Sequence, residues 1–262
     1  MAQEKKKVTK NKKQIISKKK KKRLKILKWT TLLILVVGGI SLFLLSDLFN
    51  IKEIKVINNN KITALEIKNL SGLQINQNMF QFLKLAVEEK IKQEPYIEKA
   101  NVKRNLDGTI EIEVVERVTT YMLVLENQYA YINNQGYILE ISEIKLEVPT
   151  ITGFITGSIE PGNRLEEKDL LKLDTVIQII KTANEKGLEN KITNIDIADE
   201  KDFLLTVESE SKLIHFGSSS NINDKFINIS AVLNDTIGQK GEIFVKDLNK
   251  IYFRENVREE GI

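Results

Sequence analysis

"IKQEPYIEKANVKRNLDGTIEIEVVERV", residues 91–118, decides the fold of the region around it. Pro95 disfavours helical backbone at the residue before it, so a helix that enters this stretch ends there. Two runs of alternating apolar residues follow, and the three-residue loop 106–108 between them ends in a glycine suited to left-handed backbone. This hairpin register places Lys103 opposite Glu111, an opposite-charge pair. On the apolar face it pairs Ala100 with Val114, Val102 with Ile112 and Arg104 with Ile110.

The residues before this hairpin predict one strand and two helices. Residues 50–58 alternate like a strand. Thr63 then has Glu66 three positions later, the spacing of a capping box, and Gly72 favours the end of that short helix. A second helix is predicted over about 78–94. Its apolar stripe consists of Phe80, Leu83, Val87 and Ile91. The order strand-helix-helix-strand-strand predicts an α+β unit with helices on one face of its sheet.

Charge divides the chain into a basic N-terminal tail and an acidic remainder. Residues 1–28 hold 13 lysines and one arginine against a single acid, Glu4, a net charge of +13. Because the whole chain of 262 residues carries +4, the remainder carries −9. There is no cysteine, which excludes disulfides, thiolate metal sites and a cysteine nucleophile. The tail could neutralise nucleic-acid phosphates, but it has no aromatic residue before Trp29, and contact with anionic lipid is the simpler expectation.

An uncharged stretch of 18 residues, Trp29–Ser46, follows the tail. As a helix it would be about 27 Å long, close to the thickness of a bilayer's hydrocarbon core. A cleaved signal peptide is the alternative, but the apolar run is long and shows no clear cleavage site. The positive-inside rule predicts a single-pass anchor with the tail 1–28 in the cytoplasm and residues 47–262 outside.

Beyond residue 118 the pattern changes to short strands with two further helices. Strands are predicted at 121–125, 129–132, 137–141, 192–197, 202–207 and 212–216, with two more in "GEIFVKDL" and "KIYFRENV" near the C-terminus. One helix is predicted over about 166–186, with the stripe Leu170, Leu173, Ile177 and Ile180 and with Gly187 at its cap. The other is predicted in 220–235, with Phe226, Ile229 and Leu233 facing inward, and one of the serines before it could be its N-cap. A mixed, β-rich second domain is expected.

The sequence offers little that supports catalysis. His215 is the only histidine, so no pair of histidines can bind a metal. "HFGSSS" at 215–220 allows a Ser-His interpretation, but a strand followed by a loop explains it better. No phosphate-binding glycine motif occurs, and no pair of carboxylates stands out. We therefore expect no catalytic residue, metal site, cofactor, nucleic acid or small-molecule substrate, and we expect that the protein is not an enzyme.

Several motifs together resemble the FtsQ/DivIB family of bacterial cell-division proteins. These are "IKEIKVINNNKIT", "NMFQF" and "EPYIEKANVKRNLDGTIEIEVVER", which follow a single anchor. The pattern of the last motif consists of Pro95, Tyr96, Ile97, Ala100, Val102 and Arg104, and closes on Glu116-Arg117. "YAYINNQGYILE" and "VPTITG" resemble later family steps. The chain departs at Asp107-Gly108, where the family often has a proline, and at Asn133, which stands in the place of an aspartate.

The resemblance implies an anchored protein with a POTRA domain and a β domain, and with no enzymatic activity. The expected division is a tail 1–28, a transmembrane helix 29–46, a POTRA domain 47–118, a β domain 119–255 and a short tail 256–262. It also implies a role at the division septum and binding of FtsB/DivIC-type and FtsL-type partners outside the membrane, by strand addition to the last strand. The site residues expected here are Lys250, Ile251, Tyr252, Phe253, Arg254 and Glu255.

The alternation in this strand would place Ile251 and Phe253 on one face and Lys250, Tyr252 and Arg254 on the other. We expect Tyr252 and Arg254 to contact the partner, although internal packing of both faces remains the structural alternative. The edge strand 51–57 of the first domain could receive another partner. The alternative function is a membrane-anchored protein that binds or processes cell-wall polymer.

Overall fold

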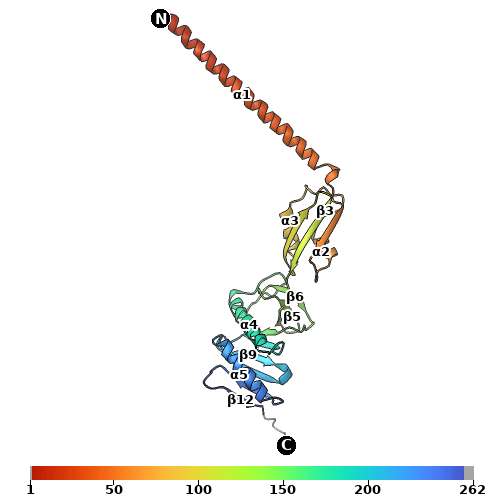
Figure 1. Ribbon diagram of the computed structural model, residues 1–262, viewed down its shortest axis with the longest axis vertical. Coiled ribbons are helices and arrows are strands. Elements are labelled where there is room, and N and C mark those ends of the chain that lie inside the picture. Colours follow the sequence, from red (N-terminus) through yellow and green to blue (C-terminus); the bar gives the residue numbers. More distant parts are fainter. Residues whose placement is uncertain (1, 257–262) are drawn as a thin grey trace. The chain divides into compact units, whose positions relative to one another are not determined.

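A computed structural model describes residues 2–256, with side chains from Lys22 onward (Figure 1). The first element is helix α1, Ala2–Leu44. Its part Lys22–Leu44 is long and apolar enough to cross a membrane, and it is the one such helix in the described part of the chain. A 3-10 turn, η1, covers Asp47–Phe49. The predicted apolar N-terminal helix is therefore present and ends two residues before Ser46.

The described residues after α1 form two sheets, and the chain divides into two compact units. Residues 1–57, 64–88 and 101–113 make the first unit, and residues 58–63, 89–100 and 114–262 make the second. Of the predicted C-terminal tail 256–262, only Asn256 lies within the described residues.

The first sheet has three strands in the order β1-β3-β2. Their bounds are β1 Glu53–Ile57, β2 Ile97–Arg104 and β3 Thr109–Glu116, and the helices α2 Ala64–Ser71 and α3 Lys84–Ile91 lie between β1 and β2 in sequence. β1 runs parallel to β3, with Ile54 beside Ile110 and Val56 beside Ile112. The buried side chains in the first unit include Ile54, Ile67, Val87, Val102, Ile110 and Ile112. The predicted α+β order of strand, two helices and two strands is confirmed.

The hairpin between β2 and β3 forms as its sequence predicts. The Asn105 N–H donates to the Thr109 carbonyl at 2.9 Å, and Gly108 has a positive φ of 98°. The Lys103 ammonium lies 3.3 Å from the Glu111 carboxylate. This opposite-charge pair is the one that the register predicted.

The second predicted helix is wrong in its first turns, because α3 begins at Lys84 and not near Asn78. The Asn78 side chain accepts a hydrogen bond from the Phe80 N–H at 2.9 Å, which competes with helical backbone. It also donates to the carbonyls of Leu44 and Ser46, both at 3.1 Å. Of the predicted stripe, Val87 and Ile91 are buried, whereas Phe80 and Leu83 are exposed.

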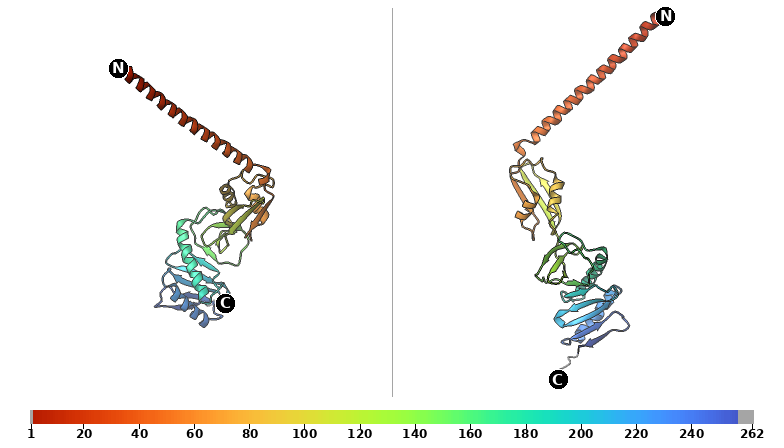
Figure 2. Two further views of the ribbon diagram at one scale, coloured as in Figure 1. Left: turned by 45° about the horizontal axis from the view of Figure 1, so that its top comes forward. Right: turned by 180° about the vertical axis from the view of Figure 1, so that it is seen from behind.

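The second sheet has nine strands in the order β12-β11-β10-β9-β8-β7-β4-β5-β6. Figure 2 shows this green-to-blue part of the chain in two further views. Their bounds are β4 Tyr121–Val124, β5 Tyr129–Ile132, β6 Ile138–Ser142, β7 Thr150–Thr152, β8 Asn194–Asp196, β9 Phe203–Val207, β10 Lys212–Gly217, β11 Gly241–Phe244 and β12 Tyr252–Glu255. β7 pairs in parallel with both β4 and β8, and β10 pairs in parallel with β11. The six strands predicted with bounds are present, with their ends moved by at most two residues. The strand predicted in "GEIFVKDL" ends early, at Phe244, and β7 was not predicted.

Two helices, α4 (Glu167–Glu185) and α5 (Ile222–Asp235), contribute to the core of this sheet. Phe226, Ile229 and Leu233 are buried as predicted. In α4 the fully buried positions include Val176, Ile179 and Ala183, whereas the predicted Leu170, Ile177 and Ile180 are only partly buried. The N-cap of α5 is Asn221 and not one of the preceding serines. Ile214, Phe216, Ile243 and Val245 point from the strands into the same core.

Candidate partner-binding edge

β12 lies at one end of the nine-stranded sheet and pairs with β11 alone among residues 2–256. The pairing is antiparallel and places Tyr252 beside Phe244 and Arg254 beside Glu242. The Asn256 N–H donates to the Lys240 carbonyl at 2.9 Å. Because hydrogen-bonded positions alternate along an antiparallel pair, the backbone groups of Tyr252 and Arg254 face β11. Those of Phe253 and Glu255 therefore face away from the sheet, where a further strand can pair with them.

The two faces of β12 differ as the sequence alternation predicted. Ile251 and Phe253 pack against the main core. Tyr252 is 43% exposed, and Arg254 and Glu255 are also exposed. Lys250 lies in the preceding turn, where its N–H donates to the Asp247 carbonyl at 2.9 Å. Of the six predicted residues, four are in the strand and two immediately precede it.

An aromatic row crosses the last three strands on the face opposite the core. The register places His215 of β10 beside Phe244 of β11, and Phe244 beside Tyr252 of β12. The rings of His215 and Phe244 stack with centroids 4.2 Å apart, and those of Phe244 and Tyr252 with centroids 4.5 Å apart. The Arg254 guanidinium lies 5.0 Å from the centroid of the Phe244 ring. Because Phe244 is buried, the row presents mainly Tyr252 and Arg254 to solvent, an aromatic ring and a cation suited to protein contact.

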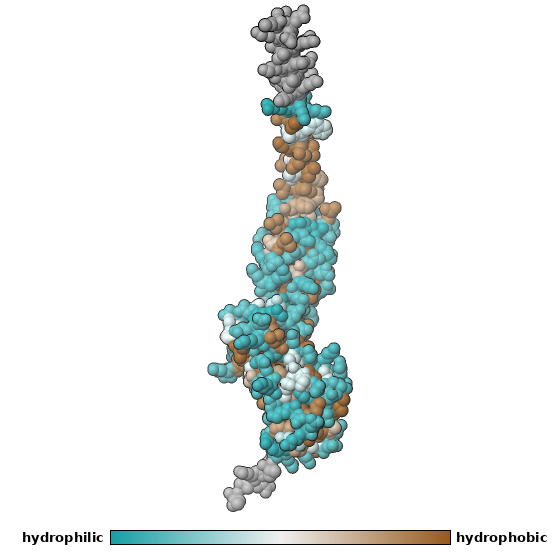
Figure 3. Space-filling view, turned by 90° about the vertical axis from the view of Figure 1, so that its left-hand side faces the viewer, coloured by the Kyte–Doolittle hydropathy of each residue, from teal (hydrophilic) through white to brown (hydrophobic). Residues whose placement is uncertain are grey.

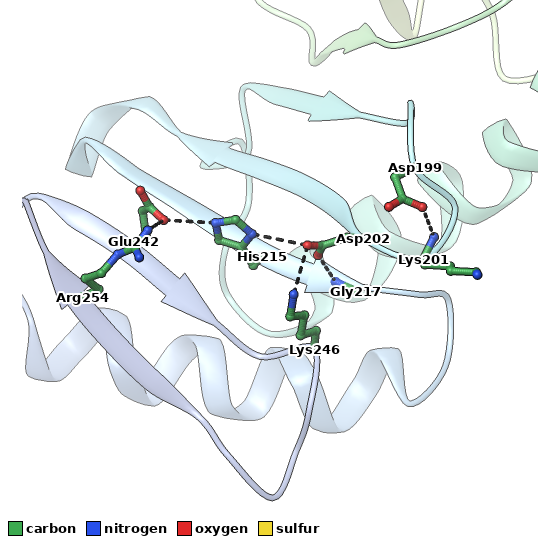
Figure 4. A network of polar contacts seen from close by, with 8 residues as sticks. All are labelled: Asp199, Lys201, Asp202, His215, Gly217, Glu242, Lys246 and Arg254. Carbon is green, nitrogen blue, oxygen red and sulfur yellow. Dashed lines mark hydrogen bonds and ion pairs between the residues drawn. The ribbon is translucent and has the colours of Figure 1, made fainter.

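Charged side chains surround this row (Figure 4). The carboxylate of Glu242 lies 3.1 Å from Nε2 of His215 and also accepts a hydrogen bond from Arg254. The carboxylate of Asp202, on the other side of the imidazole, lies 3.4 Å from its Nδ1 and 3.4 Å from the Lys246 ammonium. Asp202 also accepts a hydrogen bond from the Gly217 N–H at 3.1 Å. The network therefore connects β10, β11 and β12 through their side chains as well as their backbones.

The pKa of Glu242 reflects two opposing causes. Burial raises the pKa of this carboxyl, but hydrogen bonds and charge from Arg254 and His215 outweigh burial and hold the pKa below its ordinary value of 4.5. The carboxylate is therefore ionised at neutral pH and orients the Arg254 side chain along the sheet surface.

Sequence reasoning missed His215, Phe244, Glu242 and Asp202 as parts of this surface. The alternation in "GEIF" places Glu242 and Phe244 on one face, but only the register of β11 against β12 places that face beside Tyr252 and Arg254. His215 was correctly placed in a strand, with its serines in the following loop. No cluster of three or more histidine, aspartate or glutamate side chains able to hold a metal occurs within residues 22–256.

Comparison with known families gives two adjoining matches. The FtsQ-type POTRA domain family matches residues 49–117. The family described as FtsQ/DivIB, C-terminal related, matches residues 115–255, which is more than half of the chain. Together these matches cover both sheets.

Curated relatives from several bacteria have similar sequences. The cell division protein DivIB of Clostridium tetani is 25% identical over 206 residues, 78% of this chain and 69% of the relative. The cell division protein FtsQ of Corynebacterium glutamicum is 24% identical over 201 residues, 77% of this chain and 85% of the relative. The cell division protein FtsQ of Syntrophotalea carbinolica is 28% identical over 137 residues, which are 52% of this chain and 47% of the relative.

Proposed function

This chain belongs to the FtsQ/DivIB family of cell division proteins, and on that premise we propose that it is a non-enzymatic scaffold of the division machinery. In this proposal it links early and late division proteins at the septum. Its partners are the small single-pass proteins of the FtsB/DivIC and FtsL types, bound outside the membrane. The second unit supplies the main binding surface.

One observation carries this proposal: β12 is an edge strand whose outward backbone groups have no partner strand among the described residues. Such an edge can accept an extended segment of another chain by main-chain hydrogen bonds. The exposed Tyr252 and Arg254 lie beside that edge and can recognise the side chains of the added strand. Arg254 is suited to an acidic residue, because its guanidinium donates along a planar fork.

The proposed topology follows from the charge pattern around α1. The tail 1–28 carries +13 and stays in the cytoplasm, whereas the remainder, which carries −9, lies outside. The single span then places β12 in the same compartment as the extracytoplasmic parts of single-pass partners. Concentration at the division septum follows in this proposal from the partners and not from a lipid signal.

Co-purification tests the proposal directly. The full chain in lipid nanodiscs is mixed with the extracytoplasmic part of a DivIC-type protein, with and without an FtsL-type protein. We expect a complex with the intact chain and none with a variant that lacks residues 248–262. Equal capture by the two chains would contradict the placement of the site. The matched variant Ile227→Ala changes an exposed residue of α5 and should bind like the intact chain.

A further inference from the structure

Three segments of the first unit meet where α1 ends. The Asn78 side chain donates to the carbonyls of Leu44 and Ser46, and the Met79 N–H donates to the Phe49 carbonyl at 2.9 Å. The tip of the β2–β3 hairpin joins them, because the Lys52 N–H donates to the Gly108 carbonyl at 2.8 Å. Residues 44–52, which continue from the last turn of the apolar helix, are thus hydrogen-bonded to the loop 78–83 and to the hairpin tip 105–108.

Aromatic contacts strengthen this junction. The rings of Phe43 and Phe49 meet edge to face with centroids 5.4 Å apart, and those of Phe49 and Phe80 with centroids 5.3 Å apart. Arg104, at the end of β2, donates to the Phe82 carbonyl at 2.6 Å and lies over the Phe82 ring, 4.5 Å from its centroid. The loop 78–83 is therefore fixed both to the helix end and to the hairpin.

These segments expose large apolar side chains to solvent. Leu48 is 68% exposed, Phe80 36%, Leu83 76% and Leu106 78%. We refer to these four residues as the exit patch. Figure 3 shows hydrophobic surface along α1 and further hydrophobic residues on the part of the protein that adjoins its end. A single exposed leucine needs no explanation, but apolar residues from three segments at one junction do.

The location of the exit patch, at the end of the membrane-crossing helix, indicates what it contacts. The hydrocarbon core of a bilayer ends close to the end of a spanning helix, and the layer beyond it accepts amphipathic surface. The hydrogen bond of Asn78 to the carbonyl of Leu44 holds the loop that carries Phe80 and Leu83 at the last residue of α1. The hairpin tip that carries Leu106 is held through the bond between Lys52 and Gly108. Arg104 and Lys52 lie beside it, and such long side chains can extend from an apolar surface toward lipid headgroups. We propose that the exit patch lies in the interfacial layer of the bilayer that α1 crosses.

The absence of cysteine from the chain makes a clean test available. Three single-substitution variants, Leu83→Cys, Leu106→Cys and the control Leu65→Cys, are labelled with an environment-sensitive fluorophore. Leu65 is 67% exposed, in the first turn of α2, next to the segment 58–63 that belongs to the second unit. A fourth label at Leu35, within α1, reports insertion. Each full-length variant is reconstituted into phosphatidylcholine–phosphatidylglycerol vesicles, with or without lipid that carries a nitroxide near the top of its acyl chain.

We expect the nitroxide to quench the labels at Leu35, Leu83 and Leu106 by about half or more, and to leave Leu65 nearly unchanged, because only residues within the interfacial layer approach the nitroxide. Quenching of the Leu35 label alone would overturn the inference. The exit patch would then be a surface for a protein partner and not for lipid. Equal quenching at Leu65 would overturn it as well, because the contact would then not be specific to the patch. If the label at Leu35 is not quenched, α1 does not cross the bilayer. Both this inference and the proposed topology are then wrong. Loss of partner capture by β12 would leave this result unaffected, so the two proposals fail separately.

Discussion

Phe244 on β11 and Tyr252 on β12 lie directly opposite each other and stack, with ring centroids 4.5 Å apart and 11° between the ring planes. The contact continues the aromatic row from His215 and Phe244 to the edge strand of the sheet. Phe244 is nearly buried, whereas Tyr252 keeps 43% of its surface exposed. In the proposed complex, a strand added at β12 would meet the tyrosine ring in a preorganised position.

Replacing Tyr252 with alanine should weaken partner binding by about tenfold or more, as for an aromatic anchor near the centre of an interface. The exposed ring contributes less to the free energy of unfolding than a core residue does, so the fold should persist. Isothermal titration calorimetry of the full chain in nanodiscs against a DivIC-type ectodomain measures the change in affinity. Ile227→Ala, on α5, is the control. Unchanged affinity in Tyr252→Ala would exclude the ring from the interface.

Gly241→Ala should loosen β12 from β11. An added Cβ at Gly241 would collide with the carbonyl of Arg254 and come within 2.8 Å of the Phe253 ring. Overpacking of this kind costs on the order of 1–3 kcal/mol of the free energy of unfolding. We expect faster hydrogen exchange in residues 252–255 and weaker partner binding. Gly157→Ala, at a glycine with open space around it, should change neither, and native exchange in Gly241→Ala would show that the strand tolerates the methyl group.

The Glu242 carboxylate should give the fold a part of its acid sensitivity. Its pKa is lower in the folded protein than the ordinary 4.5, so its ionised form stabilises the fold fully above the unfolded pKa. That stabilisation is lost as the pH falls through the folded pKa. Chemical denaturation between about pH 5 and pH 3 should show a smaller loss of stability in Glu242→Gln than in the unchanged chain.

Glu255→Gln, at an exposed residue of the same strand, is the control for this titration. Its side chain takes no part in the ion pair of Glu242 with Arg254, so a difference confined to Glu242→Gln belongs to that pair. Parallel curves for all three proteins would mean that the ion pair with Arg254 has no net effect on stability, as is common for exposed pairs.

Local chemistry predicted most of the fold. The loop 106–108 and the alternation on either side of it fix the register of one hairpin, and the structure reproduces both the Lys103–Glu111 pair and the left-handed Gly108. Prediction failed where contacts with residues far away in sequence determine the local structure. Asn78 sits in a helix-like pattern, but its side chain bonds to the carbonyls of Leu44 and Ser46, which the chain brings near only after folding.

The candidate site likewise has features that the local sequence predicted and features that depend on the pairing of distant strands. The alternation of residues 250–255 placed Ile251 and Phe253 on one face and Lys250, Tyr252 and Arg254 on the other, and left open whether both faces are packed. In the structure Ile251 and Phe253 pack against the core, whereas Tyr252 is exposed. Their role in partner binding stays a prediction. The side chains of His215 and Glu242 join the same surface through a parallel pairing of β10 with β11, and no local pattern encodes that register.

We propose above that a partner strand pairs with the outer backbone edge of β12, and one substitution isolates that edge. The N–H of Glu255 faces away from β11, so Glu255→Pro removes an outward donor while it keeps the ladder to β11, as prolines in natural edge strands do. Glu255→Ala removes the same side chain but keeps the donor. In calorimetric titration with a DivIC-type ectodomain, we predict that Glu255→Pro binds about tenfold or more weaker than Glu255→Ala, at equal thermal stability. Equal affinity of the two variants would contradict strand addition at β12.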